Sequence, residues 1–365
     1  MRIAMLSAPP VPTNGWGRYA RDMVAALDAQ GHQVVMITSS NAPEQSAVGL
    51  PLAGYHRLLP SVVPLARAIW LRTLLARPTV ARLARDCDVI HVEAEPYMLA
   101  SSAAQRRVAN AHGTYVPNLV LKSSAKAMYR HAFLHATVIC GSNYTQRRVH
   151  AVLARAKTVV VPYGVDWQRF AQPGTPQARR GPTVLAVGAL KQRKGFHILT
   201  RAMSLVCQAI PDAQLVCIGS GQESAYYRDI QAQVERDGLS DSVHFLGRVS
   251  DDALLGWYHS ADLFALPVVT TDDQFEGFGL VYLEANAAGL PAIGALDSGA
   301  EDAIVDGETG LLVPQSDPDA TADAIIRILK DNALRQRMGH NGLAHARQYS
   351  WEKTAQAVIQ LYKDT

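Results

Sequence analysis

Two glutamates, Glu276 and Glu284, stand in this 365-residue chain with seven residues between them, and a Gly-x-Gly loop lies in that interval. Glu276 precedes the loop, and Glu284 falls on the helix that the loop is expected to open. The first N–H groups of a helix have no partner within it and its dipole is positive there, so the loop can bind an anion. A diphosphate fits such a site, with a sugar hydroxyl and a ribose hydroxyl donating to the two carboxylates. Solvent-exposed acids at a helix start are the competing interpretation.

A second group of charges follows another apolar run, in the segment from Gly188 to Gly195. Its cations are Lys191, Arg193 and Lys194. Cations beside a strand end can neutralise a leaving diphosphate, and lysine suits phosphate as a point charge. An ordinary basic surface loop is the alternative. Glycine loops also begin at Gly219 and Gly247, and ligands of open α/β sheets bind at the carboxyl ends of the strands.

Alternating strands and helices must position these groups. The apolar run Arg2–Ser7 predicts a buried parallel strand, helical spacing predicts a helix over residues 19–27, and Gln33–Thr38 predicts the next strand. A strand, glycine loop, helix and strand in this order begin a doubly wound sheet. Later strands of this sheet are expected at 89–92, 137–140 and 158–162, and the pattern restarts with strands at 183–188, 214–219, 243–247, 263–266 and 291–294.

The length of the chain and this restart predict two α/β domains, each Rossmann-like and doubly wound. The polar, Gly/Pro-rich segment 172–182 is the expected linker, between a first domain at 1–171 and a second at 183–348. A helical stripe predicts a C-terminal helix within 349–365. That helix can pack on either domain, including by crossing back to the first.

Composition indicates a folded protein, with 48% hydrophobic and 18% charged residues. The four cysteines form no C-x-x-C pair, which suits reduced thiols in a core. The N-terminal apolar run is far too short for a signal peptide, and no apolar run reaches the roughly 18 residues of a spanning helix. We therefore expect a cytoplasmic protein that can associate peripherally with the inner face of the membrane.

The charge is distributed unevenly along the chain. Residues 1–165 contain 18 Lys plus Arg against 7 Asp plus Glu, a net of +11, so the remainder carries −8 of the total of +3. Two long intervals, 45–85 and 96–165, contain no acid. A basic amphipathic surface of this kind attracts anionic lipid head groups, phosphates or polyanions, whereas solvated helix faces without a partner are the alternative. Nucleic acid is not expected as a partner, because no recognised binding motif accompanies the charge.

A series of motifs in a fixed order resembles glycosyltransferase family 4, which comprises retaining enzymes of the GT-B architecture. The resemblance covers nearly the whole chain. Its motifs are Gly15-Trp16-Gly17-Arg18, His112-Gly113-Thr114, Ser142-x4-Arg147, Val161-Pro162-Tyr163-Gly164-Val165-Asp166, Lys194-Gly195, Ala261-Asp262-Leu263-Phe264, Glu276-x7-Glu284 and Gly307-x2-Thr309-Gly310-Leu311-Leu312-Val313. The GT-B architecture implies that the two domains face each other across a cleft.

The resemblance also implies roles for individual residues. Glu276 would contact donor sugar hydroxyls near the reacting carbon, Glu284 would grip the ribose, and Lys194 would hold the diphosphate. His112 resembles the histidine that faces the donor sugar from the first domain, although a buried core histidine is an alternative for this residue. The catalytic set is therefore His112, Lys194 and Glu276.

Further contacts to donor and acceptor follow from the same resemblance. The donor set comprises Gly15, Gly188, Arg193, Gly219, Arg248, Val249, Gly277, Phe278, Gly279, Leu280 and Glu284, with Arg248 and Val249 at the nucleobase. The acceptor set comprises Asn14, Trp16 and Arg18. Many family members carry an arginine where this chain has Ala189, and Arg193 is the candidate to supply that charge.

The expected reaction moves a hexose-type sugar from a UDP- or GDP-type sugar to an acceptor hydroxyl, in polysaccharide or glycolipid assembly. The acceptor would be lipid-linked, phosphorylated or a saccharide. No cofactor is expected, and the lack of an Asp-x-Asp signature on a strand end predicts that no metal bridges the diphosphate. Alternatives are a nucleotide-sugar epimerase or a phosphorylase on the same architecture. A catalytically silent module that binds membranes or polyanions is an alternative of a different class.

Overall fold

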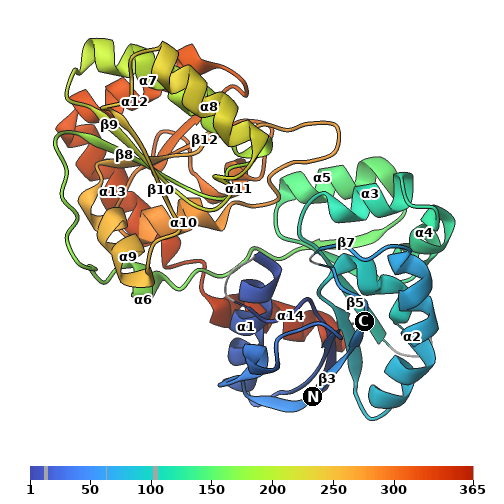
Figure 1. The fold of residues 1–365 in the computed structure, drawn as a ribbon. Helices are drawn as coiled ribbons and strands as arrows, with labels where there is room; N and C mark the ends of the chain where they lie inside the picture. The colour runs from blue at the N-terminus through green and yellow to red at the C-terminus, as the bar shows by residue number, and fades with distance from the viewer. Residues whose placement is uncertain (12–14, 63, 102–105, 365) are drawn as a thin grey trace. The chain divides into compact units, whose positions relative to one another are not determined.

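The computed structural model describes residues 1–11, 15–62, 64–101 and 106–364. It divides into two compact units, Met1–Pro162 with Trp351–Thr365, and Tyr163–Ser350. Each unit is a parallel sheet with helices packed against it (Figure 1). Two α/β domains were the expectation from the sequence, and this fold class is confirmed.

The sheet of the first unit has seven strands in the order β3-β2-β1-β4-β5-β6-β7, and every pair in it is parallel. Its central strands are buried on both faces, which explains why they consist of continuous apolar runs. The pattern of exposure along β3 is mixed because β3 is an edge strand, and neither it nor β5 was predicted as a strand. The strands are β1 (Arg2–Leu6), β2 (Gln33–Ser39), β3 (Leu52–Leu59), β4 (Val89–Val92), β5 (Arg106–Ala111), β6 (Thr137–Cys140) and β7 (Lys157–Val160).

The sheet of the second unit has six parallel strands in the order β10-β9-β8-β11-β12-β13. The strand order reverses between β8 and β11 here, and between β1 and β4 in the first unit. Ligands of doubly wound sheets bind outside the carboxyl ends of the strands at such a switch point. The strands are β8 (Thr183–Val187), β9 (Gln214–Ile218), β10 (Val243–Gly247), β11 (Leu263–Ala265), β12 (Ala292–Ala295) and β13 (Gly310–Val313).

Helices connect the strands of both units, and several begin at a side-chain cap. Ser224, Ser250 and Asp317 each accept a hydrogen bond from a backbone N–H of the following turn. In the first unit the helices are α1 (Gly15–Asp28), α2 (Ile69–Leu83), α3 (Tyr115–Leu121), α4 (Lys126–Leu134), α5 (Asn143–Val152) and α14 (Trp351–Asp364), with a short 3₁₀ segment η2 (Glu95–Ala100). In the second unit they are α6 (Trp167–Phe170), α7 (Phe196–Ala209), α8 (Ala225–Arg236), α9 (Asp251–Ser260), α10 (Leu280–Ala287), α11 (Ala300–Ala303), α12 (Pro318–Lys330) and α13 (Asn332–Ala346), with η3 (Gln192–Lys194).

The C-terminal helix α14 belongs to the first unit, a choice that the sequence left open. The ring of Trp351 lies 5.4 Å from that of Tyr19 on α1, and the Thr354 hydroxyl donates to the Pro162 carbonyl at 2.9 Å. Its buried face includes Tyr362, whose hydroxyl lies 2.5 Å from Nδ1 of His91 on β4. Burial of the apolar face of α14 against α1 and the sheet explains why the end of the chain crosses back to the first unit.

Two boundaries differ from the sequence-based prediction. The units meet between Pro162 and Tyr163, and the segment 172–182 lies in the second unit, where the Gln177 N–H donates to the Ser260 hydroxyl at 3.0 Å. Helix α1 begins at Gly15, so the Gly15 to Arg18 motif forms a helical turn instead of a loop. A Cβ at Gly17 would lie 2.2 Å from the Val11 carbonyl oxygen, so only glycine lets this turn pack against the preceding segment.

Candidate functional site

The loops after β8 and β11 meet at the switch point of the second unit, because these two strands pair directly. Gly195 ends the first loop in a left-handed conformation, with φ +73°, and a Cβ there would lie 1.8 Å from the Pro267 carbonyl oxygen. The Val269 N–H donates to the Arg193 carbonyl at 2.8 Å. Close backbone packing therefore fixes the basic loop against the loop after β11.

This packing brings two of the three cations of the basic loop to one carboxylate. Oε2 of Glu276 accepts hydrogen bonds from a terminal nitrogen of Arg193 at 2.5 Å and from Nζ of Lys194 at 2.7 Å. The side chains of Lys194 and Glu276 are 11% and 12% exposed. Charge-assisted hydrogen bonds of this kind are strong, and their partners are separated by 82 and 83 residues in the chain.

The electrostatics of this cluster favour an ionised carboxylate. Burial by itself disfavours the charge of Glu276, but Lys194 and Arg193 outweigh it and lower the pKa of Glu276 to about 2. Burial also lowers the pKa of Lys194. The charge of Glu276 opposes this shift, and the charge of Arg193 adds to it. Arg193, Lys194 and Glu276 together carry a net charge of +1, which suits an anionic ligand, and the Glu284 carboxylate also acts on Lys194.

The glycine loop between Glu276 and α10 has little room for side chains. Gly279 has φ +84°, and a Cβ there would lie 2.5 Å from the ring of Tyr282. A Cβ at Gly299 would lie 2.4 Å from the carbonyl carbon of Gly277. The absence of a side chain at Gly299 therefore allows the loop after β12 to touch the loop after β11. The Gly299 N–H also donates to the Glu276 carbonyl at 3.0 Å.

Phe278, in the middle of this loop, turns its side chain into the protein. It is 3% exposed and its ring lies 5.6 Å from that of Tyr163 and 6.1 Å from that of Tyr349. Because its side chain is buried, Phe278 can contact a ligand only through its backbone groups. Leu280, the first residue of α10, is half-buried.

Glu284 lies on α10, as predicted, and is 5% exposed. The hydroxyl of Tyr258, on α9, donates to Oε2 of Glu284 at 3.0 Å. Tyr258 is fully buried, and its aromatic contacts include Phe264 on β11. Sequence analysis did not single out Tyr258, because nothing local marks a helical tyrosine as the partner of an acid 26 residues later.

The remaining predicted donor residues lie at the ends of β8, β9 and β10. A Cβ at Gly219, where φ is +154°, would lie 1.9 Å from the Gly188 carbonyl oxygen, so Gly219 permits this close approach. At Gly188 a Cβ would meet nothing nearer than a methylene of Lys194 at 3.7 Å. Arg248 is exposed and Val249 half-buried, and both follow β10, two strands away from β8.

The switch point of the first unit holds carboxylates. Glu93 and Glu95 directly follow β4 and are fully buried. Glu95 accepts from the indole N–H of Trp16 at 3.1 Å and from the backbone N–H of His112 at 2.8 Å. Glu93 accepts from the Ala8 N–H at 3.2 Å, and its Oε1 lies 3.2 Å from Nε2 of His112.

His112 directly follows β5, and its side chain is 13% exposed. Burial disfavours its protonation, but Glu93 and Glu95 outweigh burial and raise the pKa of His112. Burial raises the pKa of Glu95 to about 7, although the charge of His112 opposes this. Nδ2 of Asn110 lies 3.2 Å from Nε2 of His112, so the tautomer of the ring depends on both neighbours.

Among the residues predicted in this unit, Gly15 is exposed, Trp16 is 8% exposed and Arg18 is half-buried. Asn14 lies outside the described residues. The structure thus brings Trp16 and His112 together on Glu95. Sequence analysis missed Glu93 and Glu95, for which the available signal was an acid placed directly after a buried strand.

Within residues 1–11, 15–62, 64–101 and 106–364, no group of three or more His, Cys, Asp or Glu side chains could hold a metal ion. In the same ranges no helix is both long enough and apolar enough to span a bilayer. Independence of a divalent cation remains a prediction from the sequence.

Comparison with known proteins identifies relatives along the whole chain. The family described as Glycosyl transferases group 1 matches residues 168–345, and Glycosyltransferase Family 4 matches residues 13–169. The chain is 30% identical over 367 residues to the GDP-mannose-dependent monoacylated alpha-(1-6)-phosphatidylinositol monomannoside mannosyltransferase of Corynebacterium glutamicum, covering 94% of this chain and 92% of the relative.

A second curated relative and a solved structure are also similar to this chain over most of its length. The GDP-mannose-dependent alpha-(1-6)-phosphatidylinositol monomannoside mannosyltransferase of Mycolicibacterium smegmatis is 30% identical over 292 residues, covering 74% of this chain and 76% of the relative. Among solved structures, sucrose-phosphate synthase from Thermosynechococcus elongatus superposes with a TM-score of 0.83 at 25% identity, covering 100% of this chain and 98% of that chain.

Proposed function

The chain belongs to glycosyltransferase family 4, and from this membership we propose that it transfers mannose from GDP-mannose to a phosphatidylinositol-type glycolipid. The names of the relatives in C. glutamicum and M. smegmatis support both the donor and the acceptor. The observation that carries the proposal in this chain is the buried cluster of Arg193, Lys194 and Glu276 at the switch point of the second unit.

In this proposal, the diphosphate of the donor binds at the basic loop and at the N-terminus of α10. Lys194 and Arg193 neutralise the leaving group, and Arg193 supplies the charge that Ala189 lacks. Glu276 accepts hydrogen bonds from the sugar hydroxyls, because cations on either side keep it ionised. Glu284, oriented by Tyr258, accepts from the ribose. Arg193 and Lys194 are already paired with the Glu276 carboxylate. When the donor binds, they exchange this anionic partner for the diphosphate.

The acceptor hydroxyl attacks the anomeric carbon from the face that the diphosphate leaves, so that the configuration is retained. The C1–O bond to the diphosphate breaks, the bond from C1 to the acceptor oxygen forms, and a phosphate oxygen takes the acceptor proton. No carboxylate nucleophile is needed, and the side chains contribute positioning and electrostatic stabilisation of an oxocarbenium-like transition state. His112, held by Glu93, is the proposed contribution of the first unit to the sugar site.

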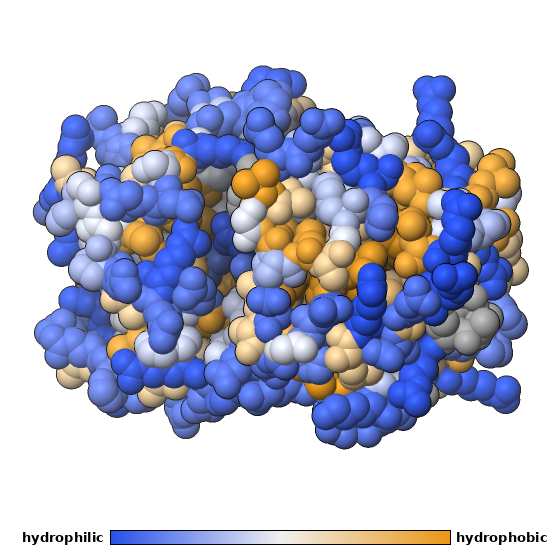
Figure 2. All heavy atoms as spheres, turned by 90° about the horizontal axis from the view of Figure 1, so that it is seen from below, coloured by the Kyte–Doolittle hydropathy of each residue, from blue (hydrophilic) through white to orange (hydrophobic). Residues whose placement is uncertain are grey.

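We propose that the first unit provides the membrane-facing side of the enzyme. Several apolar side chains on α2 and around α3 are exposed, and cations alternate with them in the sequence. Figure 2 shows apolar groups interspersed with hydrophilic residues on the face that it presents. The exposed apolar side chains include Leu71 at 40% and Leu75 at 70% on α2 and Leu121 at 51% at the end of α3, and Leu65 at 54% lies just before α2.

The experiment that tests the proposal measures transfer of labelled mannose from GDP-mannose to a phosphatidylinositol mannoside. Lys194→Ala is expected to lower turnover by about a hundred- to a thousandfold, the usual effect of removing one such stabilising contact. Lys191→Ala removes an exposed cation of the same loop and is the matched control. Near wild-type turnover in Lys194→Ala would refute the site assignment.

Two additions to the same assay test the finer parts of the proposal. Replacing GDP-mannose by UDP-glucose, with binding followed by thermal shift, tests the choice of nucleotide and sugar. Excess chelator is expected to leave turnover undiminished, and a loss that Mg²⁺ restores would show that a cation bridges the diphosphate.

A further inference from the structure

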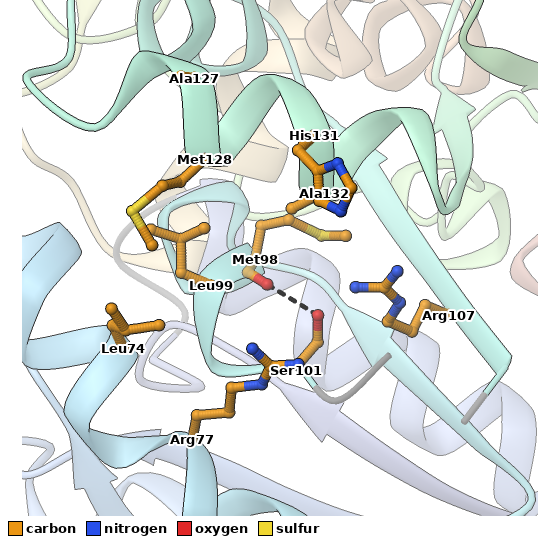
Figure 3. Close-up of a pocket in the computed structure, with 10 residues that line it drawn as sticks. All are labelled: Leu74, Arg77, Met98, Leu99, Ser101, Arg107, Ala127, Met128, His131 and Ala132. Atoms are coloured by element: carbon orange, nitrogen blue, oxygen red, sulfur yellow. Dashed lines mark hydrogen bonds between the residues drawn. The ribbon is translucent and has the colours of Figure 1, made fainter. Parts of the chain in front are cut away.

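A cavity of about 360 Å³ lies in the first unit, between α2, η2, β5 and α4 (Figure 3). Its volume falls within the range of small-molecule pockets, roughly 300 to 1,000 Å³. The lining residues are Leu74, Arg77, Met98, Leu99, Ser101, Arg107, Ala127, Met128, His131 and Ala132. None of these belongs to the predicted donor or acceptor set.

Two arginines on one side of this cavity have no acidic partner among the residues that the structure describes. Arg107 is 8% exposed, and its guanidinium donates to the His135 carbonyl at 2.9 Å. No carboxylate in the described part of the chain pairs with Arg107 or with Arg77, and the nearby sequence intervals 45–85 and 96–165 contain no acid at all. Burial, and then the charge of Arg77, lower the pKa of Arg107, so the two cations repel each other.

The opposite side of the cavity is mainly apolar, although His131 on α4 also lines the cavity. Figure 3 shows Arg77, Ser101 and Arg107 on one side, and Leu99 and Met128 on the other. The Ser101 hydroxyl donates to the Met98 carbonyl at 2.7 Å, and because it is uncharged it does not compensate the guanidinium charges. Met128 is 38% exposed, which leaves an apolar side chain at the mouth of the cavity.

The cavity is separate from the switch point of the same unit. Arg107 precedes His112 by five residues along β5 and its end, a distance of about 16 Å at ~3.3 Å per strand residue. Segment η2 connects the two places, because it begins at Glu95 and ends beside Ser101. A ligand in the cavity would therefore contact the same short element that carries Glu95.

From this arrangement we infer that the cavity binds the chain of a single-chain anionic amphiphile, with its carboxylate or phosphate between Arg77 and Arg107. An anion offsets the repulsion between the buried guanidinium of Arg107 and the half-buried guanidinium of Arg77, and guanidinium groups pair well with carboxylate and phosphate. The methionine and leucine side chains accept an aliphatic chain, and flexible methionines adapt to its shape. This ligand is distinct from the sugar donor, and the inference goes beyond the proposed transfer reaction.

The test measures binding of decanoate, decyl phosphate and 1-decanol to the full chain by isothermal titration calorimetry, below micellar concentrations. One equivalent of each anion is expected to bind, at least tenfold more tightly than the neutral alcohol. The two anions separate a fatty acid from a lipid phosphate as the source of the head group. Arg77→Gln and Arg107→Gln are each expected to weaken anion binding at least tenfold, and Ala127→Phe is expected to block all three ligands by filling the cavity.

Arg130→Gln, an exposed arginine on α4 outside the lining, is the matched control and is expected to bind like wild type. Lys194→Ala should also bind like wild type, which separates this inference from the proposed function. Equal binding of anions and alcohol, unchanged binding in both Arg77→Gln and Arg107→Gln, or loss of binding in Lys194→Ala would each overturn the inference. Failure of mannose transfer with intact decyl phosphate binding would contradict only the proposed function.

Discussion

The two units carry opposite net charges, and the charge at each switch point is the reverse of that of its unit. The first unit has a net charge of +11, because residues 351–365 add two charges of each sign to the excess in residues 1–162, yet buried Glu93 and Glu95 occupy its switch point. The second unit has −8, and Arg193 and Lys194 occupy its switch point. The net charge of a domain therefore describes its surface and its partners, and the charge of a site depends on a few buried groups.

The two carboxylate sites also differ in how their charges are compensated. Two cations outweigh the effect of burial at Glu276 and keep it ionised. Glu95 has hydrogen-bond donors and one histidine nearby, but the effect of burial is the larger one and raises its pKa. The pKa values of these two glutamates consequently move in opposite directions from the ordinary value of 4.5, to about 2 and about 7. Substitutions at each site test this difference.

The largest effect is expected from Glu276→Gln. We expect mannose transfer to fall by about a hundred- to a thousandfold, because the sugar hydroxyls lose a charged acceptor. GDP alone should bind at least as tightly as to wild type, because Lys194 and Arg193 are no longer held by a carboxylate. Steady-state kinetics together with the thermal shift produced by GDP would measure both effects. Wild-type turnover would contradict the role of Glu276, and weaker GDP binding would contradict its competition with the diphosphate.

The next effect concerns the dependence of stability on pH. A raised carboxyl pKa makes the folded state bind more protons than the unfolded state, so Glu95 should destabilise the first unit as pH rises from 4.5 to about 7, by on the order of 3 kcal/mol. The raised pKa of His112 acts in the same direction, because its contribution is complete below 6.5 and is lost at higher pH. Glu276 acts oppositely, since its contribution is present above 4.5 and is lost as pH falls toward 2.

Hydrogen exchange resolved to peptides of each unit would measure this contrast between pH 5 and 8. Glu95→Gln is expected to flatten most of the slope in the first unit, with the second unit unchanged. Glu44→Gln removes an exposed carboxylate of the first unit and is the control. An equal slope in wild type and Glu95→Gln would show that Glu95 does not retain its proton on burial.

A smaller effect is expected at the surface of the first unit. Leu75→Glu should weaken binding to vesicles of phosphatidylcholine with phosphatidylinositol at least tenfold, because an exposed apolar side chain is lost and a repelling charge is gained. Leu205→Glu, at a leucine of the second unit that is 37% exposed, is the control substitution and should have no effect. Co-sedimentation measures both, and equal loss in the two variants would remove the distinction between the surfaces.

The smallest effect is expected from Tyr258→Phe, which removes the hydrogen bond to Glu284 and leaves the carboxylate in place. A neutral donor to a charged acceptor contributes roughly 1.5 to 3 kcal/mol, part of which water or the ribose can replace. We expect the KM for GDP-mannose to rise about five- to tenfold with little change in kcat. Tyr226→Phe, on α8 and bonded to His197, is the control. An unchanged KM would mean that Glu284 needs no orientation by Tyr258.

The sequence by itself determined the fold class and the strand ends and loops on which most of the candidate site residues lie. Buried parallel strands are continuous apolar runs, and loops at their carboxyl ends carry glycine where the backbone must turn or approach closely, so these signals are local. The predicted placement of Glu284 on α10 is correct for this reason. The edge strand β3 was missed because most of its side chains are only partly buried, so its sequence is neither a continuous apolar run nor a regular alternation.

Only the tertiary structure decided which residues meet. The order of the strands brings Arg193 and Lys194 to Glu276 across more than 80 residues, and it places Glu93 and Glu95 beside His112. It also docks α14 on the first unit, and no local signal distinguishes between two apolar surfaces as partners. Pairing across a sheet and the pKa values that follow from it depend on burial and on distant charges, which local sequence patterns do not contain.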